Sequence, residues 1–211
     1  MEEVKKRKPV SIYAESTPNP GAMKFVSTRT FLHDGVSVEY NSPEEAGDSP
    51  LAQRLFTFPF VTGVFITANF ITVIKNDLVE WQEVFGEVRE YIQNYLATDH
   101  PVFSKTPVEA EAQPEANAKE EEQKVDKNAP VIPQNEMEEK IMEILEDYVR
   151  PAVASDGGAI EFNSYSEGKL TLTLKGACSG CPSSTVTLKN GIQNLFNQML
   201  PEVKDVVALE D

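Results

Sequence analysis

A segment without aromatic side chains divides this 211-residue chain into two short parts. Residues 104–134 are rich in Glu, Ala, Pro, Lys and Gln, and they include an acidic run at 120–122. Such a composition cannot bury enough apolar surface to offset the entropy that is lost on ordering. We therefore expect a flexible acidic linker at 104–134, which joins two small domains at 10–97 and 135–211.

In the first part, several segments alternate as β-strands do, and the last segment has apolar side chains at helical spacing. Strands are expected from Val10, at 23–27 and at 36–40, and helix starts at Ser42 and Ser49, each followed by proline. Residues 55–74 carry no charge and are long enough to span a bilayer, but Pro59, Gly63 and their alternation favour a hairpin in a soluble domain. Residues 81–96 have apolar side chains at helical spacing.

The second part predicts the order α-β-β-α-β and, with the first, a mixed α/β (α+β) class. Asn135 with Glu138 opens a helix that Pro151 is expected to end. Two strands follow, with Gly168 in the turn between them, then a helix with an apolar stripe from Leu188 to Met199, and a last strand at 203–209.

The chain has only two cysteines, Cys178 and Cys181, in a loop that reads GACSGCPSS at 176–184. Pro182 suits a first helical position, so it places Cys181 at the N-cap, where the positive end of the helix favours a thiolate. Gly176 and Gly180 have no side chains, which leaves room for a bulky inorganic core. We therefore expect an exposed metal site on Cys178 and Cys181.

Two thiolates do not complete such a site, because iron–sulfur clusters normally take four cysteines. His33 and His100 lie in the other domain and are expected on its surface. A homodimer supplies the missing pair. A site split between chains releases its cluster readily, which favours a carrier and not an enzyme. Two alternatives stay open: a thiol oxidoreductase, and a zinc- or iron-binding protein bridged across a dimer.

The charge balance excludes some partners, and the cysteine count and the first residues indicate a compartment. With 34 acidic and 19 basic side chains the net charge is −15, so binding to nucleic acid or to an anionic membrane is not expected. Two cysteines are too few for a secreted disulfide scaffold, the start has no apolar signal, and Glu2 and Glu3 argue against an organelle transit peptide. We expect a cytoplasmic protein.

Several segments resemble a known family. In the second part these are RPAVASDGG at 150–158, the C-x-x-C-P loop and TLKNGI at 187–192; in the first they are TPNP at 17–20, KF at 24–25, SPLA at 49–52 and FITV at 70–73. They are similar to the C-terminal NifU-like domain of iron–sulfur scaffold and carrier proteins and to the N-terminal domain that accompanies it in the Nfu type.

The resemblance implies that Cys178 and Cys181 hold a cluster, usually [4Fe–4S], with [2Fe–2S] as the alternative because both take four thiolates. It also implies transfer from the assembly machinery to apo recipient proteins, with the N-terminal domain binding partners or shielding the cluster. The sequence departs from the family pattern at Ala159, where an acidic residue is common. Asp156 is expected to be a turn or cap residue.

Overall fold

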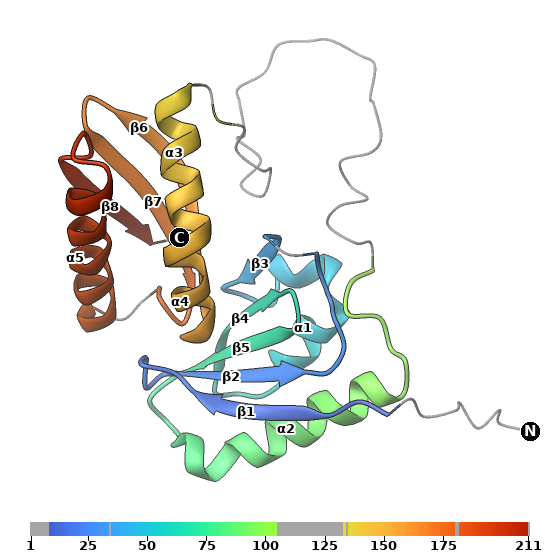
Figure 1. Ribbon diagram of the computed structural model, residues 1–211. Coiled ribbons are helices and arrows are strands. Elements are labelled where there is room, and N and C mark those ends of the chain that lie inside the picture. The colour runs from blue at the N-terminus through green and yellow to red at the C-terminus, as the bar shows by residue number, and fades with distance from the viewer. Residues whose placement is uncertain (1–8, 34, 105–132, 134, 180–181, 211) are drawn as a thin grey trace, which may run out of the picture.

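The computed structural model describes residues 9–33, 35–104, 133, 135–179 and 182–210. They form two sheets, each with its own apolar core (Figure 1). The predicted α+β class with two small domains is confirmed. The predicted domain bounds of 10–97, 104–134 and 135–211 stay a prediction, because nearly all of the predicted linker lies outside the described residues.

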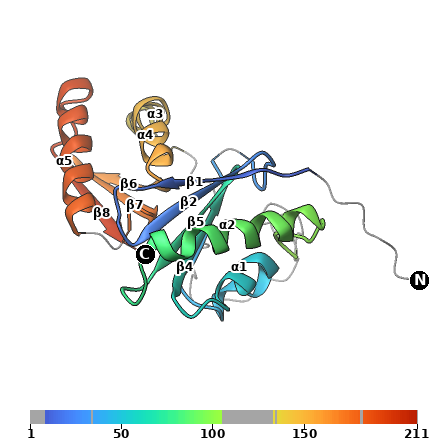
Figure 2. The ribbon, with the colours of Figure 1, turned by 90° about the horizontal axis from the view of Figure 1, so that it is seen from below.

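The N-terminal domain is a five-stranded antiparallel sheet in the order β1-β2-β5-β4-β3, with two α-helices on one face (Figure 2). The core lies between this face and the helices, and Trp81, Val88 and Ile92 of the second helix are buried in it. Its elements are β1 (Ile12–Ser16), β2 (Ala22–Ser27), β3 (Ser37–Tyr40), η1 (Glu45–Asp48), α1 (Pro50–Leu55), β4 (Val61–Thr67), β5 (Phe70–Lys75) and α2 (Trp81–Ala97).

Local sequence explains most of these elements. The Ser49 side chain accepts a hydrogen bond from the backbone N–H of Ala52, so Ser49 caps α1 as expected. The helix expected from Ser42 is only the short 3-10 helix η1, which begins at Glu45. Residues 55–74 contain the expected hairpin, which β4 and β5 form. Among the described residues, no helix has both the length and the apolar character that a bilayer crossing requires.

The C-terminal domain has the predicted order of helices and strands. Strand β7 pairs antiparallel with β6 and parallel with β8, and the helices before and after this strand pair lie on the same face of the sheet (Figures 1 and 2). Asn135 caps the first helix through its side chain, as predicted. The elements are α3 (Glu136–Ile144), η2 (Leu145–Val149), α4 (Arg150–Ser155), β6 (Gly158–Ser166), β7 (Lys169–Gly176), α5 (Pro182–Met199) and β8 (Asp205–Glu210).

The prediction that Pro151 ends the first helix is wrong. The helix passes through the π-helical turn η2 and continues as α4, in which Pro151 occupies the first turn. In the π-helical turn the Arg150 N–H donates to the Leu145 carbonyl, five residues back, and this local widening of the helix accommodates the proline that follows. The chain therefore remains helical to Ser155, and this brings Asp156, the C-cap residue of α4, next to the cysteine loop.

Candidate metal centre

The cysteine loop, residues 176–181, connects the end of β7 to the start of α5. Gly176 reverses the chain with a φ of +68°, which favours glycine. The Ala177 N–H donates to the Gly157 carbonyl at 3.2 Å, and the Ser179 N–H donates to the Gly176 carbonyl at 3.1 Å. These bonds fix the described part of the loop against the turn that precedes β6.

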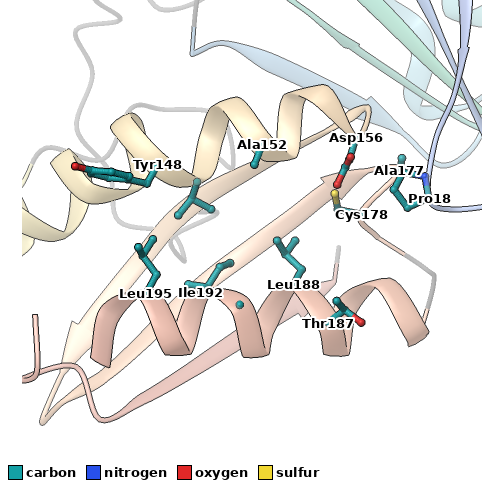
Figure 3. A pocket seen from close by; sticks show the side chains of 12 residues that line it. Pro18, Tyr148, Ala152, Asp156, Ala177, Cys178, Thr187, Leu188, Ile192 and Leu195 are labelled. Carbon is teal, nitrogen blue, oxygen red and sulfur yellow. The ribbon is translucent and has the colours of Figure 1, made fainter. Parts of the chain in front are cut away.

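Cys178 lies in this loop with its side chain buried at 6 % exposure, so the expectation of an exposed site is wrong for this residue. Its sulfur lies directly beside Gly158, because a Cβ built at Gly158 would be 2.7 Å from the Cys178 Sγ. Glycine at position 158 therefore leaves the space that the Cys178 thiol occupies. Figure 3 shows the Cys178 sulfur and the Asp156 carboxyl pointing toward each other.

The surroundings of Cys178 favour the neutral thiol. Burial, and then the negative charges of Asp156 and Glu39, raise the pKa of Cys178 to about 12. A helix N-terminus was expected to favour a thiolate in this loop, whereas the burial of Cys178 and its two carboxylate neighbours act in the opposite direction. Binding a metal through Cys178 therefore requires loss of a proton at neutral pH.

Cys178 and Asp156 also line one end of an apolar pocket of about 720 Å³, which lies between η2 and α4 on one side and α5 on the other (Figure 3). Pro18 of the N-terminal domain is part of the same wall. The remaining lining residues are Tyr148, Val149, Ala152, Ala177, Thr187, Leu188, Gly191, Ile192 and Leu195. The pocket leaves a route to the sulfur that is bordered by apolar side chains.

The second predicted ligand, Cys181, lies outside the described residues, and its N-cap position stays a prediction. Helix α5 does begin at Pro182, as expected. His33 and His100 are exposed, as predicted, and belong to the N-terminal domain. In the described part of the chain no three side chains of the His, Cys, Asp and Glu types gather as a metal site, so Cys178 has no complete ligand set there.

Sequence reasoning missed the N-terminal residues that contact this loop. The Asn19 side chain donates to the Ala177 carbonyl at 3.1 Å and to the Ser179 carbonyl at 3.5 Å. The Glu39 carboxylate accepts from the Gly176 N–H at 3.0 Å and from the Ser179 hydroxyl at 3.3 Å. A charged residue, Glu39, between Val38 and Tyr40 in a strand was the available signal, but it does not identify its partner.

Two family models match the chain. The model described as "Scaffold protein Nfu/NifU N terminal" matches residues 12–99, and the "NifU-like domain" model matches residues 141–207. The two matches correspond to the two domains of the structure.

Curated relatives match over nearly the whole chain. The protein named "NFU1 iron-sulfur cluster scaffold homolog, mitochondrial" of Drosophila sechellia is 37 % identical over 205 residues, which cover 97 % of this chain and 67 % of the relative. The "NifU-like protein C1709.19c" of Schizosaccharomyces pombe is 34 % identical over 203 residues, which cover 95 % and 73 %. The solution NMR structure of a NifU-like protein from Saccharomyces cerevisiae matches with a TM-score of 0.40 and 29 % identity, covering 50 % of this chain and 91 % of that one.

The names of these relatives correct one expectation. Several are named as mitochondrial proteins, which contradicts the predicted cytoplasmic location. The prediction depended on cysteine usage, which does not separate one reducing compartment from another, and on Glu2 and Glu3 as an argument against an organelle transit peptide.

Proposed function

Because the chain belongs to the Nfu family of NifU-like iron–sulfur cluster scaffold proteins, we propose that it binds a cluster through Cys178 and Cys181 and passes it to other proteins. The main support for this proposal is the position of the Cys178 thiol. This thiol lies in the loop between β7 and α5, beside a position that only glycine fits and at the end of an apolar pocket. The cluster is cargo, and the chain acts as a carrier and not as an enzyme.

The ligand count supports a cluster shared by two chains. Each chain has two cysteines, and a cluster takes four thiolates. No side-chain group among the described residues supplies the missing pair. A second copy of the loop therefore completes the site, with [4Fe–4S] as the proposed cargo and [2Fe–2S] as the alternative. Apo recipient proteins and the cluster-assembly machinery are the proposed partners.

A thiol oxidoreductase is the weaker candidate. Such an enzyme attacks disulfides with a thiolate, and its reactive cysteine has a pKa near or below neutrality. The environment of Cys178 raises its pKa to about 12. A raised thiol pKa disfavours redox catalysis by Cys178. It does not prevent metal binding, because a metal displaces the proton of a coordinating thiol.

The test is anaerobic reconstitution of the full chain with ferrous iron and sulfide, followed by size-exclusion chromatography with iron, sulfide and zinc analysis. We expect one cluster per two chains, and no cluster with either Cys178→Ser or Cys181→Ser. The double variant His33→Ala/His100→Ala is the control, and it should load normally because both histidines are exposed in the other domain. A stable cluster without either cysteine, or on a single chain without added thiols, contradicts the proposal. Purification with bound zinc and no cluster uptake supports the zinc alternative.

A further inference from the structure

One row of side chains crosses the whole N-terminal sheet on the face that α1 and α2 leave uncovered. The ladder pairs Glu15 with Lys24, Lys24 with Thr72, Thr72 with Phe65, and Phe65 with Glu39, so these five residues lie opposite one another on successive strands. Their neighbours along the strands point the other way, into the core beneath the helices. The row therefore belongs to the open face of the sheet.

The middle of this row is nevertheless fully buried. Thr72 and Phe65 both have 0 % exposure, and Lys24 is buried as well. Neither of the two helices covers this face, and the C-terminal domain does (Figure 2). An antiparallel sheet with one face in solvent normally carries polar, exposed side chains there. The burial of Thr72 and Phe65 thus indicates an interface.

The row contacts the backbone around the cysteine loop. The Lys24 ammonium donates to the Ser155 carbonyl at 3.3 Å. The Thr72 hydroxyl donates to the Gly157 carbonyl at 2.6 Å, which is the carbonyl that also accepts from the Ala177 N–H. The Glu39 bonds to Gly176 and Ser179 extend the same row, so the sheet recognises the main chain on both sides of Cys178.

Glycines permit this close approach. A Cβ at Gly176 would lie 2.9 Å from the Phe65 ring, and a Cβ at Gly157 would lie 3.0 Å from Thr17 and 3.2 Å from the Thr72 hydroxyl. Contacts below 3.4 Å are tighter than nearly all that real Cβ atoms make. The fit is therefore specific to this glycine-containing turn and loop.

We infer that the open face of the N-terminal sheet is a docking surface for residues 155–157 and 176–179 of the C-terminal domain, and that the two domains must separate before two chains can share a cluster. In the docked chain Cys178 is 6 % exposed, Pro18 of the N-terminal domain lies in the pocket wall beside it, and Asn19 and Glu39 bond to the loop, so the N-terminal domain occupies the side from which a second chain would approach. The docked chain is thus the closed, cluster-free form. The docking rests on the interface alone, whereas its effect on loading rests on the proposed cluster-carrier function.

Thr72 offers a clean test of docking. Thr72→Val removes the bond to Gly157 and keeps the shape, which should raise the open population about threefold to tenfold, as expected for one hydrogen bond. Thr72→Glu pairs with Lys24 across the strands when the domains are apart but places a carboxylate against the Gly157 carbonyl when they dock. It should raise the open population by more than about tenfold. Thr62→Val and Thr62→Glu are the matched controls, because Thr62 is exposed on β4 of the same sheet.

The first measurement uses the full chain with Cys181→Ser, so that an uncharged maleimide reports only Cys178. We expect the labelling rate to be highest for Thr72→Glu, lower for Thr72→Val and lowest for the parent. Both Thr62 controls should label at the rate of the parent. Hydrogen exchange of the Gly176 amide, which donates to Glu39, should accelerate in the same order. Thermal unfolding confirms that each variant is folded. Equal labelling and equal exchange in all five proteins overturn the docking.

The second measurement restores Cys181 and follows cluster loading under anaerobic conditions. Faster loading of the Thr72 variants than of the parent supports the requirement for opening. Equal loading rates, with labelling that differs, overturn that requirement. If no variant loads a cluster, the proposed carrier function has failed, while the labelling and exchange data still decide whether the domains dock.

Discussion

Replacement of Gly158 by alanine should displace the candidate ligand Cys178. An alanine Cβ at this position would lie 2.6 Å from the Lys175 carbonyl oxygen and 2.7 Å from the Cys178 sulfur, whereas ordinary contacts begin at 3.4 Å. The backbone oxygen belongs to β7, which pairs with β6 at this point, so the sheet cannot move away freely. Such overpacking costs about 1–3 kcal/mol.

The assay is calorimetric unfolding of the full chain, with Gly86→Ala as the matched control. Gly86 lies in α2 with no atom within 4 Å of its built Cβ, so its substitution should stabilise the N-terminal domain by about 0.8–1 kcal/mol. For domains of this size a change of 1 kcal/mol shifts the Tm by about 4–8 °C. Gly158→Ala should therefore lower the Tm of the C-terminal domain by at least about 4 °C and reduce cluster uptake. An unchanged Tm together with normal uptake would refute the steric argument.

Two further predictions concern stability. Asn135→Ala should cost about 1 kcal/mol, because the Asn135 side chain accepts from the N–H groups of Met137 and Glu138 at the start of α3. Urea unfolding should show this loss, and Asn135→Ser, which keeps a capping oxygen, should retain most of the stability. Burial and the hydrogen bond to Asp48 raise the pKa of Tyr40 above its ordinary value of 10.0. At pH values above 10, Tyr40 thus stays protonated in the folded chain but ionises in the unfolded chain. The unfolding free energy should therefore fall as the pH rises above 10. Tyr40→Phe should show a smaller fall, and an equal pH dependence in both proteins would contradict this assignment.

The sequence predicts elements best where one local cause determines them. The helix at 81–96 has a long apolar stripe, and the structure places it at Trp81–Ala97. The cap at Asn135 follows from its side-chain oxygen, and the turn at Gly168, with a φ of +85°, follows from the absence of a Cβ. In these cases the backbone preference and the burial pattern agree, so tertiary context does not change the result.

Pro151 shows where local rules are insufficient. A proline ends a helix when its ring and its missing N–H fall in the helix interior, but it is tolerated in a first turn. Which of these applies at Pro151 depends on the π-helical turn η2 before it. Nothing in the local sequence indicates that turn, so the continuation to Ser155 could not be predicted from the proline alone.

The buried position of Cys178 depends on contacts that the loop sequence does not show: Gly158 beside its sulfur, the apolar core of the C-terminal domain, and Pro18 in the pocket wall. Asn19 and Ala177, which share a hydrogen bond, are 158 positions apart. Reasoning from the loop alone interpreted Gly176 as room for an inorganic core, whereas in the structure the space beside Gly176 is filled by the Phe65 ring. The two interpretations are compatible if the N-terminal domain and the cluster use the same space at different times. In that case one glycine serves both the docked and the loaded form, and a larger residue there should impair both.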